Sequence, residues 1–316
     1  MDTRIKQTIS NLFIPNQKCI INTDLDGILS GMLLSKFLNW DVIGFSSCCG
    51  KITDELWLKD DTINLKSCIF IDLPVWVRDF STIDQHFVAF DLNSINEYIN
   101  SCNKLNPNVL RTKVFKDTDG KSNYTNKYPF GTVHFVLAML EYLDVIPKTY
   151  KFGFRKIIGQ FDMADLLLRA DRVIGNTYSY TPNCFDWINW ICKIGKANTN
   201  ELFSIVKNEY ISRKNKEPFV EKKLLSLGCI GSDGDCSNML RNKEYKPLEE
   251  YFSFLSQCTD LPTIDTFYFK EYAKLYGTRF NIYNNLNNLK IESKNNNVFS
   301  FAFVSMKVLS MTYFEK

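Results

Sequence analysis

The sequence predicts an α/β fold with a mainly parallel sheet that is flanked by helices. Strand-like apolar segments alternate with helical patterns through the first half of the chain, at Lys18–Asn22, Asp41–Phe45 and Ser67–Asp72, with a helix over Leu29–Leu38. The third segment is nearly continuously apolar, as strands buried on both faces are. Strands separated by helices pair in parallel through crossover connections. We therefore expect their carboxyl ends to share one edge of the sheet, where ligands bind in such folds.

Further elements follow these strands along the chain. Phe87–Phe90 is another short apolar segment, and residues 106–128 are polar and turn-rich, which predicts a long loop. Thr132 is a good N-cap for the apolar helix Val133–Tyr142. Residues 156–172 form a further helical region.

A change of pattern near residue 175 predicts two domains. Residues 1–175 form the α/β domain, and residues 176–316 form a second, smaller domain of mixed α and β structure that covers the substrate. Aromatic and Asn-rich stretches dominate this second part, and β-like alternation begins at Arg279. A chain of 316 residues is long enough for two ordinary domains.

Composition narrows the class of protein. A net charge of +3 does not support a surface that coats nucleic acid, although it leaves room for a local basic groove. The ten cysteines are scattered and include no C-x-x-C pair, so their spacing argues against a zinc ribbon. The pattern favours reduced thiols over disulfides. No uncharged apolar stretch is long enough to cross a bilayer. We expect a cytoplasmic protein with no membrane contact.

The most informative motif joins the first strand to the first helix. Asp24 and Asp26 follow the strand one residue apart, and Gly27 comes next. Neighbouring carboxylates repel each other, and a divalent cation is a common remedy. The simpler alternative is a helix N-cap with an additional acid. Asp72 ends the third strand and is predicted at the same edge of the sheet, although it too would serve as a cap.

The chain has only two histidines, and one of them lies in an acidic context. His86 follows Asp84 and Gln85 shortly after the third strand, whereas His134 lies at the start of a predicted helix. An isolated histidine is more often a structural group than a ligand. The nearby Asp72 and Asp84 make His86 the better candidate for chemistry.

The order of these segments resembles the DHH phosphoesterase superfamily, which includes RecJ-like nucleases, oligoribonucleases and cyclic-dinucleotide phosphodiesterases. The first motif of that family resembles residues 22–34, and its second resembles the strand end at Asp72. Its name-giving third motif is similar to residues 84–86, and a later helix start resembles Gly131-Thr132. The fourth motif resembles the run that ends at Asp162. The resemblance covers the chain to about residue 170.

The resemblance implies a two-metal phosphoesterase that acts on phosphodiester bonds in a nucleotide or a single-stranded nucleic acid. Carried over by position, Asp24 holds one cation, Asp26 holds the other, and Asp72 bridges them, while Asp162 completes the second site. The cations implied are Mn²⁺ or Mg²⁺. His86, with Asp84, then contacts the substrate phosphate or protonates the leaving oxygen.

Two positions depart from the pattern of that family. Asn22 and Gln85 stand where the family has metal-binding histidines, and their amide oxygens are weaker ligands for Mn²⁺ than imidazole. The two replacements therefore indicate a Mg²⁺-dependent site, a single-metal site, or a scaffold that has lost catalysis. In the last case the chain is a nucleotide- or nucleic-acid-binding subunit with a protein partner, or a homodimer.

Three further interpretations concern residues 24–27 and the second half of the chain. Residues 24–27 also fit the D-x-D-G pattern of haloacid-dehalogenase-like phosphatases, in which Asp24 is the nucleophile. In the second half, Arg213, Lys214 and Lys216 are candidates for phosphate contacts, or form a solvated loop. Trp187 and Trp190 suit base stacking or, more simply, a second core.

Overall fold

A computed structural model shows an α/β protein that divides into two compact units. It describes residues 3–47, 54–75, 79–111, 124–170, 181–209, 217–266, 269–282, 286–295 and 297–314. The first unit consists of Met1–Asn22, Ile43–Tyr128 and Phe269–Lys316, and the second of Thr23–Val42 and Pro129–Tyr268. Neither unit is a continuous stretch of chain, and no boundary between them falls at residue 175.

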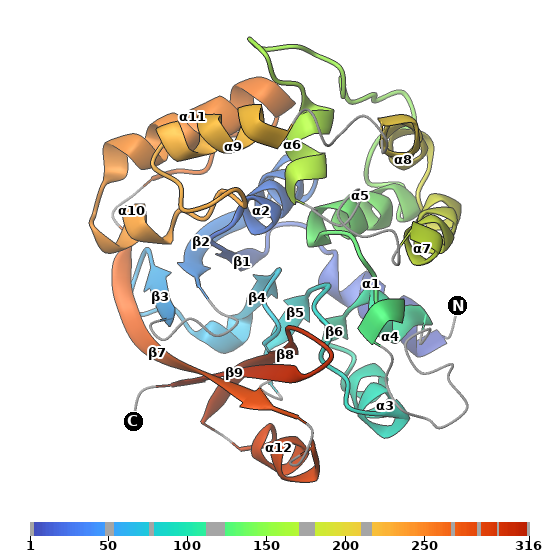
Figure 1. The fold of residues 1–316 in the computed structure, drawn as a ribbon, viewed down its shortest axis with the longest axis vertical. Helices are drawn as coiled ribbons and strands as arrows, with labels where there is room; N and C mark the ends of the chain where they lie inside the picture. Colours follow the sequence, from blue (N-terminus) through green and yellow to red (C-terminus); the bar gives the residue numbers. More distant parts are fainter. Residues whose placement is uncertain are drawn as a thin grey trace. The chain divides into compact units, whose positions relative to one another are not determined.

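The first unit contains the sheet (Figure 1). Its strands are β1 (Lys18–Asn22), β2 (Asp41–Ser46), β3 (Asp54–Leu58), β4 (Cys68–Ile71), β5 (Ser81–Ile83), β6 (Lys104–Leu105), β7 (Lys270–Asn281), β8 (Val298–Phe303) and β9 (Val308–Phe314). Its helices are α1 (Thr3–Leu12), α3 (Leu92–Ser101), α4 (Pro107–Arg111) and α12 (Leu286–Glu292), with short 3₁₀ turns η1 (Leu65–Ser67) and η3 (Tyr124–Asn126).

The nine strands form one mixed sheet in the order β6-β5-β4-β1-β2-β3-β7-β9-β8. The pairs β1–β4, β4–β5 and β5–β6 are parallel, as expected for strands joined by crossovers. The pairs β2–β3, β3–β7, β7–β9 and β8–β9 are antiparallel. The expectation of a mainly parallel sheet is therefore wrong, because the C-terminal strands extend it antiparallel from β3.

Apolar side chains cover both faces of the extended part of the sheet. On one face, Leu275 and Phe299 belong to a core that also includes Ile20, Leu56 and Phe70. On the other face, a second core joins residues 87–90, α3, α4 and α12 to β8 and β9, with members that include Phe87, Ile95, Val109, Leu289, Phe301 and Met311. Phe87–Phe90 is not a strand, and its apolar side chains fill this second core instead.

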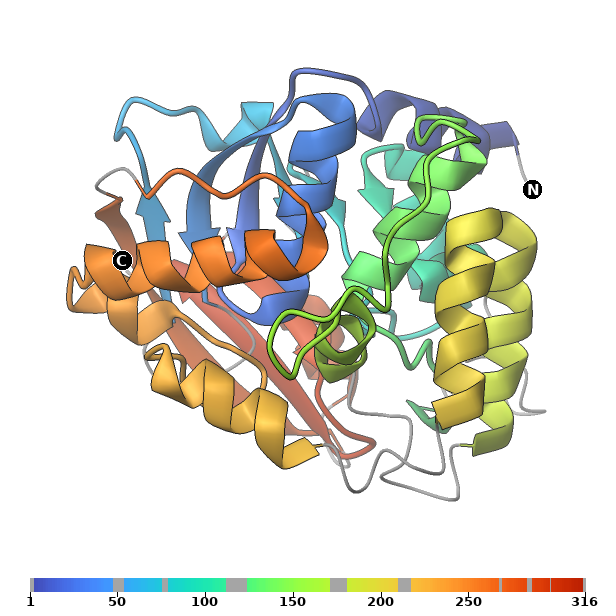
Figure 2. The ribbon, with the colours of Figure 1, turned by 90° about the horizontal axis from the view of Figure 1, so that it is seen from above.

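The second unit is helical among the described residues. Its helices are α2 (Leu25–Leu38), α5 (Thr132–Tyr142), α6 (Met163–Ala170), α7 (Thr181–Ile194), α8 (Ala197–Glu209), α9 (Glu217–Ser226), α10 (Ser237–Arg241) and α11 (Tyr245–Thr259). Helices α7 and α8 lie side by side (Figure 2). The strands expected in a C-terminal α+β domain belong instead to the sheet of the first unit. Among the described helices, none combines the length and apolar character needed to cross a bilayer.

Two helices begin earlier than predicted, and at each start a carboxylate accepts hydrogen bonds from backbone N–H groups. Helix α2 begins at Leu25, four residues before the predicted start, and Asp24 is its N-cap. Helix α5 begins at Thr132, so that Gly131 rather than Thr132 occupies the N-cap position. A Cβ atom at Gly131 would lie 2.5 Å from a carboxylate oxygen of Asp26, which explains why glycine is required there.

A buried lysine on β6 contacts two backbone carbonyls between β4 and β5. The Nζ atom of Lys104 donates hydrogen bonds to the backbone oxygens of Phe80, at 2.8 Å, and Val75, at 3.3 Å. Burial lowers the pKa of Lys104 to about 7, although the charge of Asp79 opposes this shift. In the unfolded chain the pKa returns to its ordinary value of 10.5.

This pKa difference predicts a pH-dependent stability. Between pH 7 and pH 10.5 the unfolded chain binds more protons than the folded chain, so Lys104 makes the free energy of unfolding rise with pH. Across about two pH units above neutrality, we expect the wild type to gain about 2 kcal/mol relative to Lys104→Met. Urea unfolding of both proteins, at neutral pH and about two pH units above it, measures this gain. An equal change in the free energy of unfolding of the wild type and Lys104→Met would contradict the prediction.

Candidate metal centre

The first member of the candidate centre lies at the end of β4. Asp72 directly follows Ile71, and its backbone N–H donates to the carbonyl of Ile83, at 2.9 Å, which extends the pairing with β5. The φ angle of Asp72 is 57°, a left-handed conformation in which aspartate and asparagine are better tolerated than most residues. The side chain is 1% exposed. Backbone strain of this kind is often found at functional sites.

The second member lies at the end of the neighbouring parallel strand. Asp84 directly follows β5, and its N–H donates to the carbonyl of Leu105, at 3.0 Å, beside β6. The carboxyl ends of β4 and β5 thus bring two buried aspartates to the same edge of the sheet. The sequence did not reveal β5 and β6, because strands of three and two residues are too short to show an alternating pattern.

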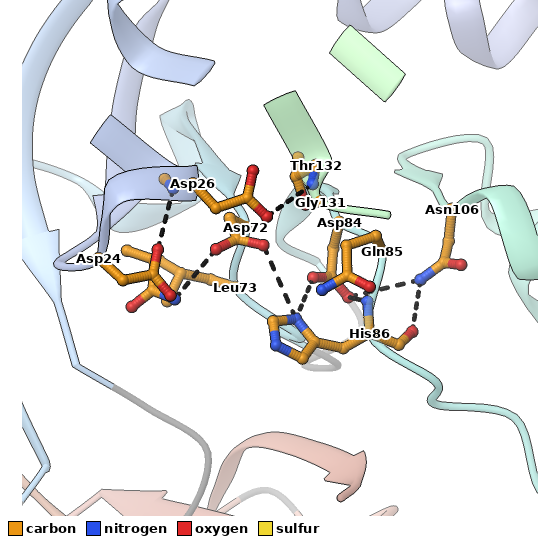
Figure 3. A network of polar contacts seen from close by, with 12 residues as sticks. Asp24, Asp26, Asp72, Leu73, Asp84, Gln85, His86, Asn106, Gly131 and Thr132 are labelled. Carbon is orange, nitrogen blue, oxygen red and sulfur yellow. Dashed lines mark hydrogen bonds and ion pairs between the residues drawn. The ribbon is translucent and has the colours of Figure 1, made fainter. Parts of the chain in front are cut away.

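The imidazole of His86 lies against both carboxylates (Figure 3). Its Nδ1 atom is 2.6 Å from Oδ1 of Asp84 and 3.9 Å from Oδ1 of Asp72. The backbone N–H of His86 also donates to Oδ2 of Asp84, at 3.1 Å. One donor atom from each of the three residues lies within 4.8 Å of the others, so these side chains can hold a metal ion.

Burial makes this arrangement electrostatically demanding. Asp72 and Asp84 are 1% and 2% exposed, whereas the side chain of His86 is 24% exposed. Two carboxylates removed from water repel each other unless a proton, an imidazolium or a cation compensates their charge. Asn22, at the end of β1, contributes one neutral hydrogen bond, from Nδ2 to Oδ2 of Asp72 at 3.0 Å. The donor set of two carboxylates and an imidazole fits a divalent cation.

The buried Tyr98 feels the negative charge of Asp84. Burial, and to a smaller extent the negative charge of Asp84, raises the pKa of Tyr98 well above its ordinary value. Tyr98 therefore stays neutral and adds no further negative charge beside the aspartates.

Two asparagines that sequence reasoning missed hold the 84–86 segment in place. Nδ2 of Asn106 donates to the carbonyl of His86, at 2.7 Å, and lies 3.4 Å from Oδ2 of Asp84 (Figure 3). Asn108 donates from Nδ2 to the carbonyl of Gln85, at 2.9 Å, and its N–H donates to Oδ1 of Asn106. The Asn106-Pro-Asn108 turn thus supports the centre, whereas the sequence indicated only the beginning of a loop. Groups that orient metal ligands in this way affect metal affinity strongly.

The second unit contains three of the other predicted ligands. Oδ1 of Asp24 accepts a hydrogen bond from the N–H of Gly27, at 3.0 Å, as the N-cap of α2 (Figure 3). The turn before α10 supports this segment, because the N–H of Leu25 donates to the carbonyl of Asp233. The capping role that the sequence allowed for Asp24 is confirmed.

Asp26 is bound to the N-terminus of helix α5. Its Oδ2 and Oδ1 atoms accept hydrogen bonds from the N–H groups of Thr132 and Val133, each at 2.7 Å (Figure 3). The partial positive charge at a helix N-terminus stabilises such a carboxylate. Each oxygen has a second lone pair, so these bonds leave metal binding chemically open.

Asp162 is similarly engaged within the second unit. Its Oδ1 atom accepts from the N–H of Asp165 at the start of α6, and its Oδ2 atom lies 3.2 Å from Nη1 of Arg155. The metal-binding roles of Asp24, Asp26 and Asp162, and their convergence with Asp72, stay predictions.

The remaining predicted site residues contribute less. Gln85 contributes its backbone carbonyl to the asparagine network. Arg213, Lys214 and Lys216 lie outside the described residues. Trp187 is fully buried and contacts Trp190 edge to face, with ring centroids 5.2 Å apart, so Trp187 belongs to a core rather than to an exposed stacking surface.

The asparagine network yields a prediction for Asn106. Asn106→Ala removes the donor to His86 and Asp84, and we expect the affinity for Mn²⁺ to fall by about 10-fold to 100-fold. The free energy of unfolding should fall by about 1–3 kcal/mol, since a buried carbonyl loses its partner. Calorimetric titration and urea unfolding measure these effects, with Asn93→Ala on the exposed face of α3 as the control. Unchanged metal affinity in Asn106→Ala would show that the network has no influence on the centre.

Comparisons with known proteins give no family. No family model matches the chain, and neither a curated protein nor a solved structure matches it. Membership of the DHH phosphoesterase superfamily therefore rests on the order of the motifs alone, and it stays a prediction.

Proposed function

We propose that the protein is a metal-dependent phosphoesterase that hydrolyses phosphodiester bonds in a nucleotide or a single-stranded nucleic acid. The observation that carries this proposal is the cluster of Asp72, Asp84 and His86, whose donor atoms lie within 4.8 Å of one another at the ends of parallel strands. The ordered motifs of the sequence supply the reaction class, and the cluster supplies a place for the metal.

The donor chemistry favours Mn²⁺ over Mg²⁺ at this centre. Mg²⁺ is usually held by oxygen ligands and water, whereas Mn²⁺ accepts imidazole together with carboxylates. Asp72 and Asp84 offer oxygen atoms, and His86 offers nitrogen. The family resemblance adds to the same proposal that Asp24 holds one cation and Asp26 the other, with Asp72 as the bridge and Asp162 at the second site.

Each residue of the centre has a distinct task in this proposal. A cation bound here supplies Lewis acidity and lowers the pKa of water that attacks phosphorus. Asp72 holds the cation, and Asn22 orients its carboxylate through the bond to Oδ2. Asp84 orients the imidazole of His86 through the contact with Nδ1, and Asn106 fixes the position of both residues. The side chain of His86 is more exposed than those of Asp72 and Asp84, so it is the most accessible of the three to a substrate.

The first test removes one negative charge from the centre. Asp72→Asn should lose Mn²⁺ binding and Mn²⁺-dependent cleavage of a short single-stranded DNA, because asparagine cannot provide the anionic oxygen. Folding should persist, since asparagine tolerates the left-handed backbone. Calorimetric titration, a cleavage assay and circular dichroism measure these properties, with the exposed Asp265→Asn as the control. Cleavage at the wild-type rate by Asp72→Asn would refute the proposal.

A second test separates two roles for His86. If the imidazole is a metal ligand, His86→Gln should weaken Mn²⁺ binding by at least about tenfold, the loss typical of groups that merely orient ligands. If it acts only on the substrate, Mn²⁺ affinity should be unchanged while cleavage falls. The proposed centre predicts the first result, and calorimetric titration with Mn²⁺ decides between them.

A second candidate function is a binding subunit without hydrolysis. Asn22 favours it, because the amide that replaces a metal-binding histidine already bonds to Asp72 and adds no charge. Absence of Mn²⁺ and Mg²⁺ binding at millimolar concentration, together with binding of a nucleotide, would support this alternative.

A further inference from the structure

The C-terminal strands have one face that changes from apolar to polar along its length. Strand β7 pairs with β3 over Lys270–Leu275 and continues beyond it, paired with β9. On the face that carries Leu275 and Phe314, the next residues are polar or small. The register places Gly277 opposite Thr312, Arg279 opposite Ser310, and Ser300 opposite Thr312 on the same face. We call Gly277, Arg279, Ser300, Ser310 and Thr312 the polar face.

Two hydroxyl groups on the polar face are buried without a hydrogen-bond partner. The Oγ atoms of Ser300 and Ser310 have none within the described part of the chain, and both residues are 0% exposed. A buried donor that stays unpaired costs about 1–3 kcal/mol, and such groups call for an explanation. Both lie on the same face of the sheet, and a ligand that accepts hydrogen bonds would satisfy both.

An arginine stands at the rim of this face. Arg279 is exposed and pairs in register with Ser310, so their Cβ atoms are about 4.5–5.5 Å apart. Among the described residues its side chain makes no ion pair and no hydrogen bond. Lys274 is also exposed on β7, but it pairs with Glu55 and lies on the opposite face. Lys274 and Arg279 thus face different sides of the sheet.

The same strands are bonded to both segments that carry the metal-binding candidates. The N–H of Phe301 donates to the carbonyl of Pro74, two residues after Asp72, at 3.2 Å. The N–H of Phe303 donates to the carbonyl of Phe87, which directly follows His86, at 2.7 Å. Ser300 also forms an antiparallel bridge with Val75. Strand β8 therefore holds the polar face beside the candidate metal centre within the first unit.

We propose that the polar face binds a phosphate group of the substrate, with Arg279 as the charged contact and the hydroxyls of Ser300 and Ser310 as donors. This inference rests on the proposed function, because it concerns the substrate of that centre. The guanidinium group matches phosphate oxygens with two parallel N–H bonds, and hydroxyls complete the contact without adding charge. In this arrangement one phosphate of a phosphodiester chain lies at the metal and another lies at Arg279.

The test measures binding without hydrolysis. A fluorescein-labelled single-stranded DNA pentamer is titrated with the full chain in EDTA, and fluorescence anisotropy gives Kd. Arg279→Gln should raise Kd by about tenfold or more and reduce the dependence of Kd on salt by one phosphate contact. Lys274→Gln, which removes an exposed charge from the other face of β7, should leave Kd within about twofold. Equal effects of the two variants would overturn the inference.

The serines provide a second signature that a purely structural role would not produce. Ser310→Ala and Ser300→Ala remove unpaired buried hydroxyls, so thermal stability should be unchanged or higher. Both variants should nevertheless raise Kd for the pentamer by a factor of several. Higher stability with unchanged Kd in both serine variants would mean that the hydroxyls serve packing alone, and it would overturn their part in binding.

The outcomes separate this inference from the proposed function. Binding that depends on Arg279, without Mn²⁺-dependent cleavage of the pentamer, would support the phosphate site and refute the hydrolase. Cleavage with the same KM in Arg279→Gln and in the wild type would support the hydrolase and refute the phosphate site. Absence of binding by the wild type would refute the phosphate site.

Discussion

The structure of the candidate centre depends on one electrostatic constraint, the burial of two carboxylates beside a single imidazole. Asp72 and Asp84 lie at the ends of neighbouring parallel strands, and each is almost completely removed from water. The short contact between Asp84 and His86 relieves part of the repulsion, and the amide of Asn22 relieves less, because it is neutral. A divalent cation would satisfy the remaining charge, which links the geometry directly to metal-dependent chemistry.

Long-range backbone pairing keeps this constrained cluster in place. Strands β5 and β6 fix Asp84 from one side, and the Asn106–Asn108 turn fixes the segment that follows it. Strand β8 arrives from the C-terminal end of the chain and bonds to the residues just after Asp72 and His86. The C-terminal segment thus supports the centre through backbone hydrogen bonds, which place its polar face near the centre within the first unit.

Much of the local structure could be predicted from the sequence, because it depends on neighbouring residues. Strand β1 has the predicted bounds, β2 and β4 are shifted by one residue at most, and Asp72 ends an apolar strand as expected. Asp84 and His86 were singled out by residue type and spacing alone. The direction of the later strands could not be predicted, because it depends on β7 pairing with β3, more than 200 residues earlier in the chain. The role of Asn106 depends on its contact with His86, which lies 20 residues earlier in the chain.

The central claim is that a cation occupies the space between Asp72, Asp84 and His86. Anomalous diffraction from crystals of the full chain grown with Mn²⁺ tests it most directly. The account predicts an anomalous peak within coordination distance of a carboxylate oxygen from each aspartate and of the imidazole of His86. Crystals that show Mn²⁺ only elsewhere, with the three side chains still in direct contact with one another, would contradict it.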